Sequence, residues 1–289
     1  MVGCRAMTAQ LLKGRELATR VREQSKQDIR ELGFVPKVVA IHNEDNPACG
    51  VYMRMQKNLF EKSGVEYEIF SIGEKTTEQQ VREQINLFNR DPEIHGITMH
   101  VPLPGGFDTD GLSQQISPGK DIEGVHPHNI GMIAYGEHNP TPCAARAGVE
   151  LAKTVHTSFQ GMETVVVGHG TLVGKPIAFF LLQEKRVAAT PTICHIATED
   201  LSFHTRRADL LFVAVGKAGL IQKEMVKPGA TVIDIGINKG PEGTIVGDVA
   251  HDVREVGRVG AEGIETVVRR GGVQRGARIP VRSIHLEVV

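Results

Sequence analysis

The hydrophobic pattern of the first hundred residues switches repeatedly between helical and strand periodicity. A short apolar run of the kind found in buried strands lies at residues 38–41, residues 66–72 alternate between polar and apolar positions, and residues 96–99 are the next predicted strand. Apolar positions recur at helical spacing over residues 8–33, over residues 48–63 and again after Thr77. Thr77 and Gln80 have the spacing of a capping box, which predicts that a helix begins there. This alternation of strands and helices predicts a parallel α/β sheet.

A second alternation follows a Gly- and Pro-rich stretch at residues 105–145. It predicts strands at residues 165–167, 192–195, 208–215 and 231–235, and helices at residues 146–154 and 176–182. We therefore expect two α/β domains, residues 1–145 and 146–289. From about residue 255 the periodicity is weak, and five Arg lie between Arg269 and Arg282. This end is expected to be an atypical, frayed basic tail.

Composition narrows the function classes. The 33 basic and 34 acidic residues give a net charge of −1, which argues against a nucleic-acid partner. No apolar run reaches the roughly 20 residues that cross a bilayer, and no signal pattern begins the chain, so we expect a cytoplasmic protein without a membrane partner. The 4 cysteines are widely spaced, which argues against a zinc site and predicts that no metal is needed.

The clearest nucleotide signal is the run Gly168-His169-Gly170-Thr171-Leu172-Val173-Gly174, between a predicted strand and a predicted helix. Glycines there let a backbone approach a pyrophosphate, and the N–H groups of the helix N-terminus face the anion. The spacing has one residue more than the usual G-x-G-x-x-G, and a tight strand–helix turn is the structural alternative. Two further glycine turns, at Gly216 and beside Ile237, follow later predicted strands.

The first predicted domain offers separate polar residues. Tyr52 and Gln56 share a helix face because they are four residues apart. His100 ends a predicted strand, and Asp121 and Glu123 lie in the Gly-rich connection. Taken singly, each has an ordinary reading as a packing or solvated side chain.

Several segments in the same order resemble the methylenetetrahydrofolate dehydrogenase/cyclohydrolase family over about residues 8–250. The matching segments are Asn46 to Tyr52, Val101 to Pro104, Lys120 to Gly131, Pro142-Cys143, Gly168 to Pro176, Ala208 to Leu210, Val213 to Gly216, Lys227 to Asn238 and Val246 to Val249. The resemblance implies an N-terminal α/β folate-binding domain and a C-terminal Rossmann-type NAD(P)-binding domain. It implies oxidation of methylene-tetrahydrofolate by hydride transfer, then hydrolysis to formyl-tetrahydrofolate, by a homodimer in one-carbon metabolism.

Three departures from the family pattern cluster in the first domain. The family Lys four residues after Tyr52 is Gln56, the Gln before the Pro-Leu-Pro turn is His100, and the second acid of Asp-x-Asp-Gly is Glu123. Gln has no titratable proton, so we expect the cyclohydrolase step to be weak or lost, with His100 assisting proton handling. The alternative is a folate- or nucleotide-binding pseudoenzyme that serves as a regulator or dimer partner.

The resemblance also assigns binding roles. Tyr52, Pro102, Asp121 and Glu123 are expected to contact the folate, and Tyr52, Gln56 and His100 to form the catalytic set. Cofactor contacts are expected from Gly168, His169, Gly170, Thr171, Gly174, Lys175, Ile196, Gly216 and Ile237. Family members that use NADP carry Arg or Ser where Ile196 and Ala197 stand, and Glu199 would oppose a 2′-phosphate, so the sequence favours NAD over NADP. The family's C-terminal Pro- and Gly-rich segment is missing, which fits a shifted reading frame or a genuine truncation of function.

Overall fold

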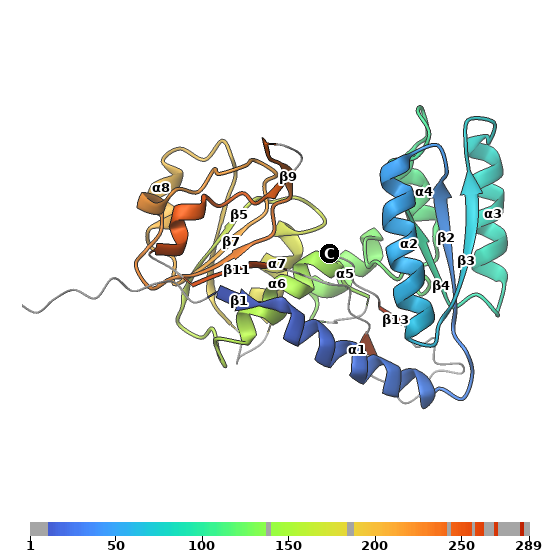
Figure 1. Ribbon diagram of the computed structural model, residues 1–289, viewed down its shortest axis with the longest axis horizontal. Coiled ribbons are helices and arrows are strands. Elements are labelled where there is room, and N and C mark those ends of the chain that lie inside the picture. Colours follow the sequence, from blue (N-terminus) through green and yellow to red (C-terminus); the bar gives the residue numbers. More distant parts are fainter. Residues whose placement is uncertain are drawn as a thin grey trace, which may run out of the picture.

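A computed structural model describes residues 11–136, 140–183, 188–241, 244–255, 258–262, 269–270 and 284–285. The chain folds into two α/β lobes that are joined by α1 (Gly14–Arg30), α5 (Pro127–Ala134) and α6 (Cys143–Lys153) (Figure 1). None of the helices in these ranges is long and apolar enough to cross a membrane.

The first lobe is a three-stranded parallel sheet between helices. Its strands are β2 (Lys37–Asn43), β3 (Glu66–Ile72) and β4 (Gly96–Met99), in the order β3-β2-β4. Helices α2 (Pro47–Lys62) and α3 (Glu78–Arg90) cover opposite faces of the sheet, because Phe60 packs with Val38 whereas Ile85 packs with Val39. Thr77 and Gln80 form the predicted capping box. The elements predicted for this lobe between residues 38 and 99 are confirmed.

The second lobe is a six-stranded parallel sheet with the strand order β1-β11-β8-β7-β5-β6. Its strands are β1 (Leu11–Lys13), β5 (Glu163–Val167), β6 (Thr190–Cys194), β7 (Leu210–Val213), β8 (Thr231–Asp234) and β11 (Arg258–Glu262). Its helices are α6 (Cys143–Lys153), α7 (Gly174–Gln183) and α8 (Leu201–Thr205). The two-domain α/β architecture predicted from the sequence is confirmed.

Short elements complete the described chain. They are α4 (Thr109–Gln115), α5 (Pro127–Ala134), β9 (Asn238–Lys239), β10 (Ile245–Val246), β12 (Arg269–Arg270), β13 (Ile284–His285) and 3-10 turns at Lys223–Met225 and His251–Glu255. Most of the predicted basic tail lies outside the described residues, but residues 258–262 form β11 and pair with both β1 and β8. The expectation of a frayed tail is therefore wrong for that segment.

The N-terminal segment crosses to the other lobe. Residues 8–33 were expected to form one helix, yet β1 pairs with β11 in the second sheet and α1 (Gly14–Arg30) begins only after it. Leu12 lies in the core of the second lobe beside Ile133 of α5. Leu11 and Leu12 fit both a helical stripe and a buried strand, and the pairing that decides between them involves residues nearly 250 positions away, so it is invisible locally. The predicted domain boundary near residue 145 stays a prediction.

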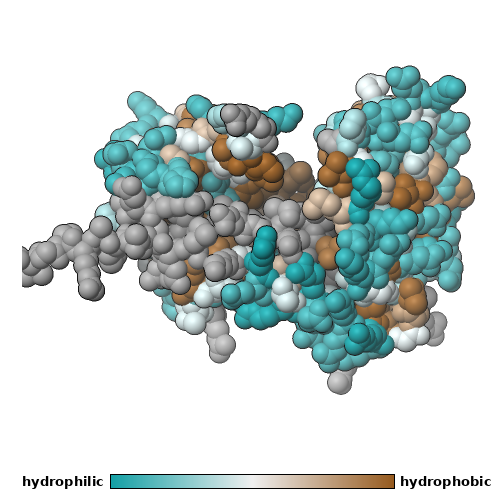
Figure 2. All heavy atoms as spheres, viewed as in Figure 1, coloured by the Kyte–Doolittle hydropathy of each residue, from teal (hydrophilic) through white to brown (hydrophobic). Residues whose placement is uncertain are grey.

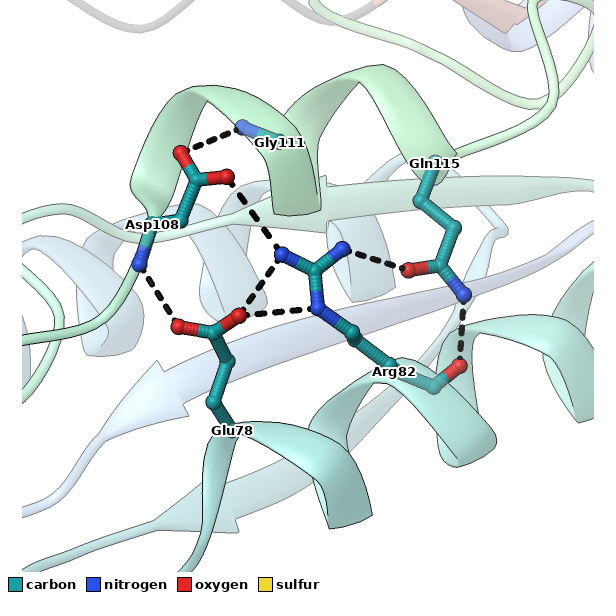
Figure 3. A network of polar contacts seen from close by, with 5 residues as sticks. All are labelled: Glu78, Arg82, Asp108, Gly111 and Gln115. Atoms are coloured by element: carbon teal, nitrogen blue, oxygen red, sulfur yellow. Dashed lines mark hydrogen bonds and ion pairs between the residues drawn. The ribbon is translucent and has the colours of Figure 1, made fainter.

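A polar network ties α3 to the loop that leads into α4 (Figure 3). The Arg82 guanidinium donates to Glu78 Oε1 at 2.8 Å and to Gln115 Oε1 at 3.3 Å, and it lies 3.4 Å from Asp108 Oδ2. Asp108 in turn caps α4 by accepting from the Gly111 N–H at 2.9 Å. The network therefore fixes the end of the loop that starts at His100.

We expect Arg82→Met to lower the free energy of unfolding by about 1 kcal/mol, because the lost contacts are partly exposed and screened by solvent. Urea denaturation followed by circular dichroism would measure the change. Arg90→Met, at an exposed position of the same helix, is the matched control and should shift the midpoint less. Equal stability of the two variants would contradict a role for this network.

Candidate active site

One face of the first sheet becomes polar near its carboxyl end. Side chains two residues apart on a strand share a face, so His42 of β2 lies on the side of Val38 and Ala40, which pack against α2. His100 directly follows β4, and its N–H donates to the Ile41 carbonyl at 2.9 Å. Across this face, α2 carries Tyr52 and Gln56, one helical turn apart. The structure thus brings together the three predicted catalytic residues.

Gln56 is the centre of a buried hydrogen-bond network. Its Oε1 accepts from the Tyr67 hydroxyl at 2.5 Å and lies 2.8 Å from His100 Nε2. Its Nε2 donates to the Tyr52 hydroxyl at 3.5 Å. Only 1% of Gln56 is exposed, so every polar atom of this amide is satisfied by protein groups. Gln56 is part of the protein's own polar core and is not a solvent-facing side chain.

His100 is held neutral by its surroundings. Burial lowers its pKa to about 4, and the neighbouring His42 adds to this shift. The two Nδ1 atoms are 3.4 Å apart, and burial also lowers the pKa of His42. The ring of Tyr52 packs edge-on against that of His100, with centroids 5.1 Å apart. At neutral pH, therefore, His100 offers hydrogen bonds but no positive charge.

Two tyrosines border this network. Burial raises the pKa of both Tyr52 and Tyr67 above the usual value, and the carboxylate of Glu123 contributes in each case. Both hydroxyls therefore stay protonated at neutral pH and act as neutral donors and acceptors. Tyr67 was not predicted as a site residue, and neither was His42.

The two predicted carboxylates have different tasks. Asp121 is buried, and its oxygens accept from the N–H groups of Glu123, Gly124 and His126 and from the Asn129 amide, at 2.8 to 3.1 Å. These four bonds shape the turn that presents Glu123. Burial raises the pKa of Glu123 to about 7, the Thr98 hydroxyl opposes this shift, and Asp121 adds to it. The predicted contacts of both residues with a substrate stay predictions.

The loop after β4 is anchored beside the network. The Val101–Pro102 peptide bond is cis, and the Asn43 amide donates to the Pro102 carbonyl at 2.9 Å. The Cys49 thiol donates to the Val101 carbonyl at 3.5 Å. These contacts place Pro102 between the carboxyl end of β2 and the start of α2.

The raised pKa of Glu123 predicts a stability that depends on pH. Its folded-state pKa of about 7 lies above the ordinary value of 4.5, so the folded protein holds a proton that the unfolded chain releases. The stabilisation is complete below about pH 4.5 and is lost as the pH rises through 7. We expect Glu123→Gln to abolish this trend, on the order of 2 kcal/mol, between pH 5 and 8.

Urea unfolding of the native chain and of Glu123→Gln at both pH values tests this expectation. Glu93→Gln, at an exposed position, is the matched control and should keep the native trend. If the free energy of unfolding changed equally with pH in the native chain and in Glu123→Gln, this result would contradict the expectation.

The Gly-rich turn of the second lobe needs glycine at two of its positions. Gly168 has φ +110°, and a Cβ there would lie 2.2 Å from the Ala214 carbonyl oxygen. A Cβ on Gly174 would lie 1.9 Å from the Gly168 carbonyl oxygen, so α7 can start this close to β5 only with glycine. A Cβ on Gly170 would meet nothing within 4 Å, so the fold itself does not require glycine there. An uncovered backbone before a helix N-terminus suits a pyrophosphate.

A buried carboxylate organises the neighbouring turns. Asp248 accepts from the backbone N–H groups of Val215, Gly216 and Lys217 and from the Asn238 amide, at 2.7 to 3.0 Å. It thereby holds the turn after β7 against the turn after β8. Sequence reasoning missed this role, although an Asp after an apolar strand within a matching segment was a usable signal.

The remaining predicted cofactor residues lie on the same edge of the second sheet. The imidazoles of His169 and His195 stack with centroids 4.3 Å apart, which joins the turn after β5 to the end of β6. Exposed side chains surround these turns: Thr171, Lys175, Ile196 and Ile237. The carboxyl ends of parallel strands are where such sheets bind nucleotides.

The surface is hollowed between the two lobes, and hydrophobic side chains lie along its wall (Figure 2). Exposed apolar side chains follow strand ends in both lobes, including Val101 after β4, Leu172 after β5 and Ile237 after β8. Such a hollow can hold a flat aromatic ligand bound to one lobe against a nucleotide bound to the other lobe.

The chain matches two family models in this same order. Residues 12–123 match the catalytic domain of tetrahydrofolate dehydrogenase/cyclohydrolase, and residues 142–268 match the NAD(P)-binding domain of that family. The chain belongs to this family.

Individual members of the tetrahydrofolate dehydrogenase/cyclohydrolase family agree with the match. The bifunctional protein FolD 2 of Mesorhizobium japonicum is 43% identical over 83% of this chain and 80% of its own. The crystal structure of the bifunctional FolD enzyme of Campylobacter jejuni superposes with a TM-score of 0.81 at 33% identity, over 87% of this chain and 90% of its own. The Trypanosoma brucei FolD structure, complexed with NADP and an inhibitor, gives a TM-score of 0.79 at 28% identity, over 88% and 90%.

Membership confirms the resemblance read from the sequence. A folate substrate and an NAD(P)-binding domain fit this family. The roles assigned to single residues stay predictions, as does the choice between NAD and NADP.

Proposed function

We propose that this chain oxidises methylene-tetrahydrofolate to methenyl-tetrahydrofolate with a nicotinamide cofactor, and that its cyclohydrolase activity is weak or lost. The observation that carries this proposal is the buried amide of Gln56 at the position where the family has Lys. An amide has no proton to exchange near neutral pH, so it cannot serve as a general acid or base.

The two chemical steps make different demands on this site. In the oxidation, a C–H bond of the substrate breaks and its electron pair leaves with the hydrogen, so no proton moves. A bound nicotinamide would accept that hydride, and the turns at Gly168–Gly174 and Val215–Lys217 would hold its dinucleotide. In the hydrolysis, water adds to the methenyl carbon and must lose a proton to a base. Gln56 has no basic atom to take it. Both ring nitrogens of His100 face protein groups, and a pKa of about 4 makes this imidazole a weak base.

We further propose that NAD is preferred over NADP. At the end of β6 the exposed Ile196 and Ala197 offer no charge, and the carboxylate of Glu199 would repel a 2′-phosphate. His195 Nδ1 accepts from the Ala197 N–H at 3.2 Å, so this nitrogen is already engaged by the protein. The Trypanosoma brucei relative was crystallised with NADP, so a preference for NAD would distinguish this chain from that relative. We expect His169→Arg to raise kcat/KM for NADP about tenfold, the effect of one charge-assisted contact.

The decisive assay mixes the purified chain with methylene-tetrahydrofolate and either NAD or NADP. We expect absorbance of reduced cofactor with both and a higher kcat/KM with NAD, together with slow disappearance of methenyl-tetrahydrofolate when it is supplied alone. No turnover with either cofactor, despite measurable binding of both ligands, would favour the pseudoenzyme. Rapid hydrolysis of the methenyl compound would refute the reduced cyclohydrolase. Sedimentation of the same sample tests the homodimer that the family resemblance implies.

A further inference from the structure

The hydrogen-bond network around Gln56 has a direction. Two groups converge on Gln56 Oε1, the Tyr67 hydroxyl and His100 Nε2. A carbonyl oxygen can only accept, so both groups must donate, and the amide nitrogen is left to face Tyr52. The neutral His100 therefore carries its single ring proton on Nε2.

This tautomer leaves His100 Nδ1 as a bare acceptor. The group facing it is Nδ1 of His42, 3.4 Å away. Two bare nitrogens would repel each other, so the proton of this contact must lie on His42. His42 is 5% exposed and His100 is 3% exposed, so solvent does not compete for the contact. Glu44 and Arg54 are the charged groups that act on His42, and their effects on its pKa oppose each other.

At the other end, the direction determines what Tyr52 offers. Its oxygen accepts from Gln56 Nε2 at 3.5 Å, and its own proton is donated to no other group among the hydrogen bonds of the described residues. Tyr52 is partly exposed, whereas Gln56 is fully enclosed. The proton of the hydroxyl is thus available to an acceptor atom of a ligand.

We propose that His42 is a positioning residue that sets the tautomer of His100 and thereby makes the Tyr52 hydroxyl a hydrogen-bond donor toward the folate substrate. The order of donation is His42 to His100, His100 to Gln56, Gln56 to Tyr52, and Tyr52 to the substrate. The proposal concerns only the direction of these hydrogen bonds, and no covalent bond is made or broken. The last link rests on the proposed function, whereas the first three concern the protein alone.

The opposite direction is chemically distinct. If His100 carried its proton on Nδ1, the Gln56 amide would turn over, and Tyr52 would donate to Gln56 and present only lone pairs to a ligand. The two directions differ in the tautomer of His100. NMR of the 15N-labelled imidazole distinguishes these tautomers without any substrate.

The test uses the full chain with 15N-labelled histidine, and His100→Gln identifies the signals of His100. We expect a single Nε2–H tautomer for His100 in the native chain. His42→Leu removes the donor and should give a mixture of tautomers, with dehydrogenase kcat/KM about tenfold lower, the effect of one lost hydrogen bond. His42→Asn places an amide N–H near the position of Nδ1, and it should restore one tautomer and most of the activity.

An Nδ1–H tautomer in the native chain, or an unchanged tautomer in both variants, would overturn the proposal. If His42→Leu does not fold, the native chain and His42→Asn still decide the tautomer. Should the native chain show no dehydrogenase activity, the proposed function fails, yet the NMR result still decides whether His42 directs the network.

Discussion

Gln56→Lys should raise the cyclohydrolase activity about a hundredfold, the usual contribution of one well-placed acid–base group. The substitution puts an amine on α2 within reach of the hydroxyls of Tyr52 and Tyr67. Because the site is buried, the pKa of the new amine should fall toward neutrality, which suits proton exchange with water. Hydrolysis of methenyl-tetrahydrofolate, followed by its absorbance, measures the gain.

The neighbouring Lys57 provides the matched control. It lies about 100° around the helix from Gln56 and pairs with Glu61 at 3.8 Å on the surface. Lys57→Gln should leave both activities unchanged. The double variant Gln56→Lys/His100→Gln restores the family pair and should exceed the single variant, because the imidazole no longer competes for the amine. A cyclohydrolase rate that stays flat in both Gln56 variants would refute our interpretation of Gln56.

Asp248→Ala should be the most destabilising of these changes, by about 4 kcal/mol, because it removes a fully buried carboxylate on which several partly buried donors depend at once. Three backbone N–H groups and the Asn238 amide lose their acceptor. For a chain of this size the midpoint of thermal unfolding should fall by about 10 °C. The KM for the dinucleotide should rise as well, because the turn at Gly216 is no longer held.

Asp248→Asn separates these effects, since its amide keeps one acceptor oxygen and should lose only part of the stability. Asp252→Ala, on an exposed position four residues away, is the matched control and should unfold like the native chain. An Asp248→Ala variant with native stability would show that the turns after β7 and β8 are held by other contacts.

Local patterns predicted most of the fold, because strand–helix alternation is encoded in neighbouring residues. The capping box at Thr77 and the glycines of 168–174 are local features, and both are found as expected. The pairing of β1 with β11 was missed because it joins two segments nearly 250 residues apart in the sequence, and no short window contains both partners.

For the same reason, only some residues of the candidate site could be predicted from the sequence. Tyr52 and Gln56 share a helix face, so their proximity followed from spacing alone. His42 and Tyr67 read as ordinary strand residues, because their role depends on three strands and α2 meeting at one place. The neutral state of His100 likewise depends on burial, which a motif does not reveal.

The pairing of β1 with β11 in the second lobe has a consequence for biosynthesis. A ribosome makes residues 11–13 long before their neighbour β11, which emerges only after some 240 further residues. The second sheet is therefore complete only after residue 262 has been translated, and such long-range contacts slow folding. Until then, Leu11 and Leu12 lack their partner strand, and a chaperone could shield them.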